Sequence, residues 1–391
     1  MAIAPLPQVV VTPVAHFPEK YFLENLTVRA DGSVLITAVL QKELWYVPGP
    51  ARTLADPVLL HTFDHPVTGI VEIAPDVFVL SLTEAYTTHE SHLVRLDLND
   101  WSPGSQVDPA VIFTFDERAR GLNGSCQLGP GVMAVADCFA GLIWRVDLTT
   151  GAHSATARVW AEHDTMADDP DSEIPWPPQP GINGVRYGAE TGYLYYTSTA
   201  QKVFMRVPVD PVTLDAAGTP EFIAAITDGD DFAIDETAGF AYVTRHRANT
   251  LDRVPLTPRH GSEVRHLAGE PFDPVIVGPS SAYWGCEPGD KGRALYVTTD
   301  GGTTAPPAGV VRNAALLPRR TRSPPRHRIM INTLRSGEGP LHVDQNRSIV
   351  LFRLGSRPCP RSPMSIATRA GRTFSTPPAS ASCATASTPR P

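Results

Sequence analysis

Four polar residues of the sequence could together bind a metal ion. They are two carboxylic acids and two amides, each placed just before a short apolar segment: Glu24, Asn123, Asn183 and Asp231. Carboxylate and amide oxygens are the ligands that Ca²⁺, Mg²⁺ and Mn²⁺ prefer in proteins. The set therefore predicts a divalent-cation site if the fold brings the four together. The alternative is that the two Asn-Gly pairs, at 123–124 and 183–184, only form turns.

Residues near the same segments could enclose a substrate. Four of them are aromatic, namely Tyr187, Phe232, Tyr283 and Trp284. Such rings either line an apolar pocket or pack in the core between sheets. His246 follows a predicted strand, and its imidazole could serve as an acid or base near neutral pH. The alternative for His246 is a solvated turn.

The elements that must position these residues follow from a repeat. Three segments share one pattern of a polar loop, a short strand, a turn with glycine, a β-branched and aromatic strand, and an alternating strand. They begin at Gly121, Gly181 and Gly229, and the pattern returns more weakly near residues 25, 68 and 281. Alternation with turn residues between the strands indicates antiparallel meanders. Six such sheets predict an all-β fold, a six-bladed β-propeller.

Both ends of the repeat region contain additional strand-like segments. The stretches 8–12 and 309–317 lie outside the complete repeats, and we expect one or both to complete a shared blade that closes the ring. The propeller is therefore expected to span residues 1–317. In such a ring, the starts of the innermost strands converge on the central channel.

Residues 318–391 differ in composition from the rest of the chain. They contain thirteen arginines, no lysine and two acids, and they are rich in proline, serine and threonine. Because such a segment buries little apolar surface, we expect a disordered basic tail. Two alternatives remain, a basic arm that binds RNA or membrane and a segment read in a shifted frame.

The composition of the whole chain excludes several classes of function. Its 391 residues carry a net charge of -8, which gives no reason to expect binding to nucleic acid. No apolar run is long enough for a membrane span, and residues 1–18 do not resemble a signal peptide. We expect a cytoplasmic protein, in which Cys126 and Cys138 are free thiols rather than a cross-strand disulfide. The sequence has neither a Gly-rich phosphate loop nor a Gly-x-Ser-x-Gly elbow.

The polar residues resemble the ligands of a known family, the calcium- and zinc-dependent lactonase propellers related to gluconolactonase and regucalcin. The matching motifs are LENLTVRADGSVLIT, GINGVRYGAETGYLYYT, GDDFAID and GLNGSCQL. The resemblance implies that Glu24, Asn183 and Asp231 hold Ca²⁺ or Zn²⁺, with Asn123 nearby and no organic cofactor. The Asp-Gly of the family is replaced here by Asp231-Phe232, which suits a more apolar substrate than a sugar lactone.

The opening FLENLTVRADGSVLIT and the closing YVTTDGGTTAPP resemble a fungal branch of these propellers. This branch includes hetero-Diels-Alderases of tropolone sesquiterpenoid biosynthesis. The resemblance implies a [4+2] addition of a tropolone-derived o-quinone methide to a humulene-type terpene, both of them small hydrophobic intermediates. Confinement in near-attack geometry and exclusion of water would accelerate such a step.

Three functions remain open at this point. In a cycloaddition, Phe232, Tyr283 and Trp284 shape the pocket while Asn123 or Asn183 hydrogen-bonds the diene. In a metal-dependent lactone hydrolysis, Asp231 or a metal-bound water delivers the attack. The third function is a binding propeller without catalysis.

Overall fold

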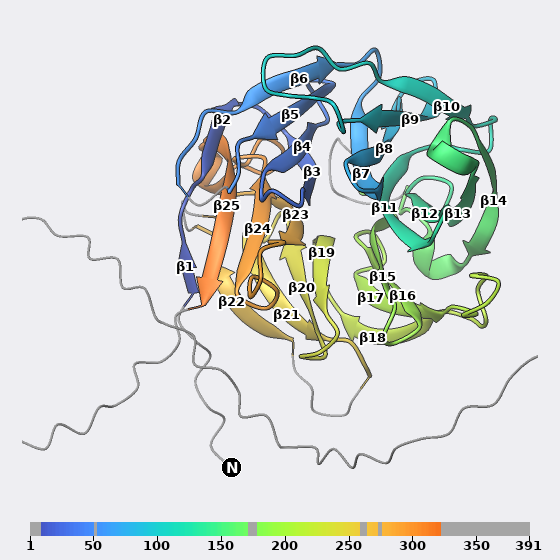
Figure 1. Ribbon diagram of the computed structural model, residues 1–391. Helices are drawn as coiled ribbons and strands as arrows, with labels where there is room; N and C mark the ends of the chain where they lie inside the picture. Colours follow the sequence, from blue (N-terminus) through green and yellow to red (C-terminus); the bar gives the residue numbers. More distant parts are fainter. Residues whose placement is uncertain (1–8, 51–52, 171–177, 259–263, 273–275, 322–391) are drawn as a thin grey trace, which may run out of the picture. The chain divides into compact units, whose positions relative to one another are not determined.

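The computed structural model describes residues 9–50, 53–170, 178–258, 264–272 and 276–321. Within these residues the chain forms six antiparallel sheets, five of four strands and one of five (Figure 1). The inner strands of neighbouring sheets contact each other around the whole series, and the sixth sheet contacts the first. The predicted all-β, six-bladed propeller is confirmed.

The strands follow the chain blade by blade. Blade one contains β3 (Leu23–Val28), β4 (Val34–Ala38), β5 (Glu43–Val47) and β6 (Val58–Thr62). Blade two contains β7 (Val67–Ala74), β8 (Val77–Thr83), β9 (Ser91–Asp97) and β10 (Ala110–Thr114). Blade three contains β11 (Leu122–Gly129), β12 (Val132–Asp137), β13 (Leu142–Leu148) and β14 (Ala155–Glu162). Blade four contains β15 (Ile182–Gly188), β16 (Tyr193–Ser198), β17 (Val203–Pro208) and β18 (Glu221–Ala225). Blade five contains β19 (Gly229–Asp235), β20 (Phe240–Arg245), β21 (Thr250–Pro255) and β22 (Arg265–Gly269). Blade six contains β23 (Pro279–Trp284), β24 (Ala294–Thr299), β25 (Asn313–Thr321), β1 (Val9–Val11) and β2 (Ala15–Glu19). Short 3₁₀ turns occur at Thr150–Ala152, Asp164–Met166 and Pro307–Gly309.

Burial along the strands follows from their place in a blade. The second strands β4 and β8 are buried at every residue, because neighbouring sheets cover both of their faces. The outer strand β14 alternates between more and less exposed residues, as expected for a strand with one wet face. The apolar cores therefore lie between adjacent blades.

The last blade closes the ring with strands from both ends of the described chain. β1 and β2 both pair with β25, which is also the third strand of the sixth sheet. This confirms that the flanking segments share one blade. β25 continues to Thr321, four residues beyond Leu317, where we expected the propeller to end. The remainder of the predicted tail lies outside the described residues.

Hydroxyl groups join the blades near the axis of the ring. Thr37 Oγ1 donates to the carbonyl of Thr68 at 2.8 Å, and Thr68 Oγ1 donates to that of Leu122 at 2.9 Å. The same bond recurs from Thr197 to Asp230, from Thr244 to Ser280 and from Ser280 to Leu23. Between blades three and four, Gly181 N donates to the carbonyl of Cys138 at 2.9 Å. We refer to the bonds from the hydroxyl groups of Thr37, Thr68, Thr197, Thr244 and Ser280 as the hydroxyl belt.

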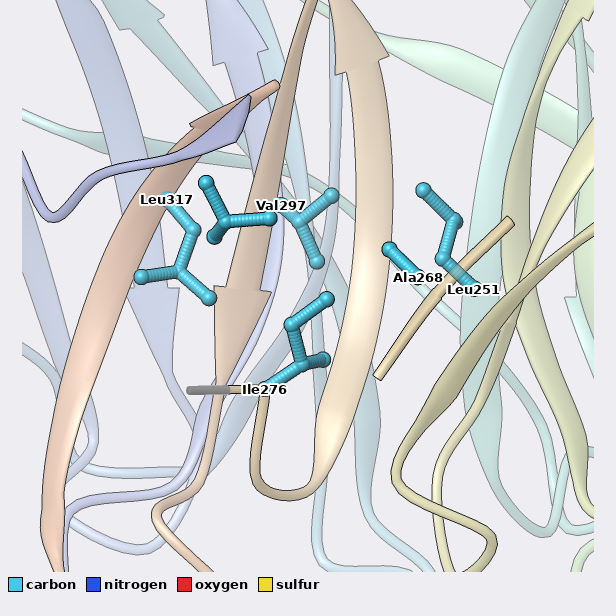
Figure 2. A pocket seen from close by; sticks show the side chains of 6 residues that line it. Leu251, Ala268, Ile276, Val297 and Leu317 are labelled. Carbon is cyan, nitrogen blue, oxygen red and sulfur yellow. The ribbon is translucent and has the colours of Figure 1, made fainter. Parts of the chain in front are cut away.

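A small void remains where the ring closes. Figure 2 shows apolar side chains around it, contributed by strands of blades five and six and by the connection at Ile276. Its volume of about 10 Å³ is lined only by apolar atoms. A water molecule needs two or more polar partners, so this void is a packing gap and not a ligand site. A second, larger hollow lies beside β25 in the same blade. Its lining includes none of the candidate site residues.

Other expectations can be compared with the structure. Cys126 and Cys138 are buried free thiols, as predicted. Among the described residues, no helix is long and apolar enough to cross a membrane.

The closing strand β2 gives a test of ring closure. Phe17 is 2% exposed and lies edge-on against Trp45 of blade one, with ring centroids 5.4 Å apart. Phe17→Ala should lower the free energy of unfolding by about 3–5 kcal/mol, measured by urea denaturation. The control is His16→Ala, because His16 is exposed on the same strand. Equal stability of the two variants would contradict this role of β2.

Candidate functional site

A shared irregularity in the inner strands creates the candidate site. In every blade the pairing of the first and second strands shifts near the start of the first strand. Two inner-strand residues there face a single residue of the second strand, which is a bulge. The bulge turns side chains out of the regular alternation, toward the axis of the ring. We call these positions the first and second bulge positions.

The first bulge position carries most of the predicted polar residues. Its six occupants are Glu24, Thr68, Asn123, Asn183, Asp230 and Ser280. Glu24, Asn123 and Asn183 therefore occupy equivalent places, as expected. In blade five the equivalent residue is Asp230 rather than Asp231, because Gly229 is the last paired residue before the bulge, as Leu23, Leu122 and Ile182 are in the other blades. The second bulge position holds Asn25, Gly69, Gly124, Gly184, Asp231 and Ser281.

Asp231 belongs to a separate buried cluster. Its Oδ2 accepts hydrogen bonds from Arg186 Nη2 at 2.5 Å, Ser281 Oγ at 2.7 Å and Asn25 Nδ2 at 3.2 Å. These partners come from blades four, six and one, so Asp231 connects four blades. Gly184 leaves the necessary space, since a Cβ there would lie 2.3 Å from Asp231 Oδ1. The guanidinium supplies the positive charge that a metal ion would otherwise bring to this carboxylate.

Three side chains of the first bulge position, Glu24, Asn183 and Asp230, interact with one another and could hold a metal ion. Asn183 Nδ2 donates to Thr199 Oγ1 at 3.1 Å, while Asn183 Oδ1 is buried without a hydrogen-bond partner. Asn183 and Glu24 both interact electrostatically with Asp230. The described residues contain no cluster of three His, Cys, Asp or Glu side chains that could hold a metal. By chemistry, Glu24, Asn183 and Asp230 fit a divalent cation, and Asp231 does not.

The carboxylic acids at the axis are electrostatically unusual. Burial raises the pKa of Glu24 to about 7, assisted by Asp231 and Asp300 and opposed by His246. Burial also raises the pKa of Asp230 well above its ordinary value, with Glu24 and Asp231 adding to the effect. Protons are therefore retained at this site near neutral pH. Such acids can donate a hydrogen bond to a substrate oxygen.

His246 lies at the same end of the ring, in the turn after β20. Its Nε2 is 3.1 Å from Asp300 Oδ2, a fully buried carboxylate after β24. The contact has the distance of an ion pair but not the angle of a hydrogen bond. The imidazole also stacks on Phe22, with ring centroids 5.4 Å apart and planes inclined by 24°. The sequence left open whether His246 acts as an acid or base or lies in a solvated turn, and it gave no sign of the contacts with Asp300 and Phe22.

Partly exposed aromatic side chains occur at this end of the ring. Phe22 precedes β3, Tyr86 lies in the turn after β8, and Phe139 follows β12. Tyr86 is 47% exposed and meets Phe139 edge-on, with centroids 5.6 Å apart. We call Phe22, Tyr86 and Phe139 the aromatic rim. Sequence analysis missed them because they lie in turns outside the repeated strands.

The aromatic residues proposed from sequence occupy different surroundings. Phe232 is fully buried between blades and meets Phe204 edge-on, so it has no surface for a ligand. Tyr187, Tyr283 and Trp284 are near the ends of β15 and β23, opposite the end that carries Glu24 and Asn183. Trp284 Nε1 donates to the carbonyl of Ile234 at 2.8 Å. These four rings pack against the apolar cores between blades.

The Arg186–Asp231 pair predicts a stability effect. Arg186→Met leaves the Asp231 carboxylate buried without its charged partner, which should destabilise the fold by about 3–5 kcal/mol. Adding Asp231→Asn should recover most of this loss, as measured by urea unfolding of the single and double variants. The matched control is Arg206→Met, whose partner Glu221 is more exposed. If both single arginine variants lose the same free energy of unfolding, the Arg186–Asp231 pair does not stabilise the contacts between blades.

The pKa of Glu24 predicts a pH dependence of stability. The pKa of Glu24 is 4.5 in the unfolded chain and about 7 in the folded protein. Between these two pH values the folded protein holds more protons than the unfolded chain. The free energy of unfolding should therefore fall as the pH rises through this window. Glu24→Gln should flatten the fall in melting temperature between pH 4.5 and 7, whereas exposed Glu190→Gln controls for loss of one negative charge. A steeper fall in Glu24→Gln would contradict the raised pKa.

Comparison with known proteins supports the propeller fold. No protein-family model matches the sequence. Over 337 residues the chain is 25% identical to the "Putative hetero-Diels-Alderase asR5" of Sarocladium schorii, covering 75% of this chain and 78% of that protein. The structure resembles a gluconolactonase of Xanthomonas campestris, with a TM-score of 0.54, 11% identity, and 80% and 90% of the two chains covered.

A second solved structure is the calcium-binding protein regucalcin of Agrobacterium tumefaciens. It has a TM-score of 0.52 and 15% identity, with 81% of this chain and 98% of that chain covered. The resemblance inferred from the motifs is thus confirmed: the chain resembles gluconolactonase and regucalcin propellers in fold, and a hetero-Diels-Alderase in sequence.

Proposed function

We propose that this protein is an enzyme of secondary metabolism that catalyses a hetero-Diels-Alder addition at the end of the ring carrying Glu24. The observation that carries the proposal is the aromatic rim around groups that retain protons, in a chain similar in sequence to a hetero-Diels-Alderase. The diene is an o-quinone methide derived from a tropolone, and the alkene is a humulene-type terpene. Both partners are small and largely apolar, and no nucleic acid takes part.

The reaction asks for little covalent chemistry from the protein. The methylene carbon of the quinone methide bonds to one alkene carbon, and its carbonyl oxygen bonds to the other. All atoms of both substrates stay in the product, and no proton is gained or lost. A hydrogen bond to the carbonyl oxygen withdraws electron density from the diene and stabilises the charge that develops there. Glu24 in its acid form and His246 supply such donors.

The aromatic rim would hold the apolar partner. Phe22 stacks on His246, so a terpene resting on Phe22 lies next to a hydrogen-bond donor. Tyr86 and Phe139 form a second apolar wall. Holding both partners in contact replaces a bimolecular encounter by a near-attack arrangement. The same walls exclude water, which would otherwise quench the quinone methide.

One observation favours a second function, metal-dependent lactone hydrolysis. The buried Oδ1 of Asn183 has no hydrogen-bond partner and lies in the same group as Asp230 and Glu24. These three residues would hold Ca²⁺ or Zn²⁺, and the ion would polarise the lactone carbonyl when bound. Asp230 is then the carboxylate placed to position the attacking water. A propeller that only binds small molecules remains the third possibility to be tested.

The test compares product formation with and without a chelator. The purified protein is given humulene and an o-quinone methide generated in situ, and the adduct is resolved by chiral chromatography. We expect one stereoisomer in excess, unchanged by EDTA, and at least about tenfold slower formation with Tyr86→Ala. The control is Phe222→Ala, because Phe222 is 53% exposed on the outer strand β18.

Other outcomes identify the alternatives. A racemic adduct formed at the rate seen without protein would overturn the cycloaddition. Hydrolysis of a lactone panel that requires Ca²⁺ or Zn²⁺ and is lost in Asp230→Asn would establish the lactonase instead. Binding of the substrates without turnover of either class would leave a binding propeller.

A further inference from the structure

Asp300 is fully buried and is held by donors from its own turn. Gly302 N donates to its Oδ1 at 2.6 Å, and Thr304 donates to its Oδ2 from both N and Oγ1, at 3.2 and 3.3 Å. The turn itself is fixed by Asp300 N, which donates to the carbonyl of Gly278. The carboxylate therefore has a defined orientation, with Oδ2 directed at His246.

Gly278 shows how closely this arrangement is packed. Its φ of +63° lies in the left-handed region, and a Cβ at this residue would lie 1.6 Å from Asp300 Oδ1. Gly278 N donates to Asn249 Oδ1 at 2.9 Å, and Asn249 follows His246 in the same turn. The backbone of blade six and the turn that carries His246 are thus fastened together independently of the ion pair.

His246 is held on two sides. Asp300 lies at its Nε2, and the ring of Phe22 covers its face. The backbone N of His246 donates to the carbonyl of Asp228 at 2.9 Å, which fixes the start of the turn. Within the part of the chain that the structure describes, Nδ1 makes no hydrogen bond. Its surroundings are the end of the ring that carries Glu24 and the aromatic rim.

We propose that Asp300 is a positioning residue, which holds the protonated ring of His246 so that its Nδ1–H is presented to the carbonyl oxygen of the diene. This inference rests on the proposed function, and it assigns the hydrogen-bond donor of that reaction. No covalent bond to the protein forms, and no net proton transfer occurs. A carboxylate behind a histidine selects one ring orientation and stabilises the protonated ring.

The charges around His246 agree with this role. Burial lowers the pKa of His246, but Asp300 and then Glu24 raise it, and Arg247 lowers it. The net result is a pKa above the ordinary value for histidine. Asp300 from blade six, Glu24 from blade one and Arg247 from its own turn are the titratable groups that interact electrostatically with the imidazole. Removing the Asp300 charge should therefore lower the pKa.

The experiment measures the His246 side chain directly. ¹⁵N-labelled full-length protein is titrated by NMR, with the His246 signals assigned from the His246→Gln variant. Asp300→Asn keeps the size of the side chain and removes its charge, so the His246 midpoint should move to lower pH. Addition of tropolone, a stable oxygen-bearing analogue of the diene, should shift the Nδ1 signal in the original protein and much less in Asp300→Asn.

A second histidine provides a matched control. Asp252 is also buried, and its Oδ1 lies 3.1 Å from His266 Nδ1, on the outer strands of blade five. Asp252 also pairs with Arg245, the residue before His246, at 3.0 Å, so Asp252→Asn tests whether the loss of a nearby carboxylate alone shifts the titration. We expect the His246 midpoint and the response to tropolone to stay unchanged. In adduct formation we expect about a hundredfold lower kcat for His246→Gln and a smaller loss, about tenfold, for Asp300→Asn, with an unchanged KM for the terpene.

The outcomes separate this inference from the proposed function. An unchanged His246 midpoint in Asp300→Asn, or an Nδ1 signal that does not respond to tropolone, overturns the role of Asp300. If both NMR results are as expected and no adduct forms, the cycloaddition fails while the positioning of His246 stands. A loss of stability without any change in the His246 titration would show that Asp300 is only structural.

Discussion

The hydroxyl belt is the constraint on which the rest of the structure depends. Each blade alone is a sheet of four or five strands with two apolar faces, and it becomes stable only when neighbours cover both faces. The belt fixes how adjacent blades meet, because a buried hydroxyl such as Thr37 or Thr244 reaches the carbonyl of the next inner strand. A buried carbonyl without such a partner would cost about 1–3 kcal/mol. The belt thus provides hydrogen bonds for carbonyl oxygens at the bulges, where the regular pairing of the strands is interrupted. It thereby offsets the free-energy cost of the bulges.

The bulges in turn link architecture to chemistry. A regular inner strand would send alternate side chains into the two faces of its sheet, where acids cannot be accommodated. The bulge instead sends two consecutive side chains toward the axis, and blade five uses this for two adjacent acids with separate roles. Asp231 is neutralised by Arg186 and holds the ring together. No cation among the described residues pairs with Asp230, which shares the proton-retaining environment of Glu24. One bulge therefore carries a carboxylate that links four blades and a second carboxyl group whose pKa is raised by burial.

Sequence patterns predicted the ring because its repeat is long and its strands alternate regularly, and they predicted the shared last blade from the leftover strands. They also placed Glu24, Asn123 and Asn183 at equivalent positions. They could not distinguish Asp230 from Asp231, since the two aspartates are adjacent and only the strand pairing shows which of them is equivalent to Glu24. Phe232 was predicted to line a pocket because it follows Asp231. It is the first regularly paired residue after the bulge, so its side chain lies in the core between blades. The pairing of His246 with Asp300 depends on how two turns from different blades meet, which no local pattern records.

The closure of the last blade has a consequence for the order in which the ring can form. Ser280 bonds to the carbonyl of Leu23, 257 residues earlier in the chain, and β1 must wait for β25 before it has a partner. During synthesis, the first blades can assemble against one another while the ring stays open, with one face of blade one and the strands before it uncovered. Contacts of such long range are slow to form, and open sheet edges invite association with other chains. Only after the residues up to Thr321 have been synthesised can the ring close and cover these exposed sheet edges.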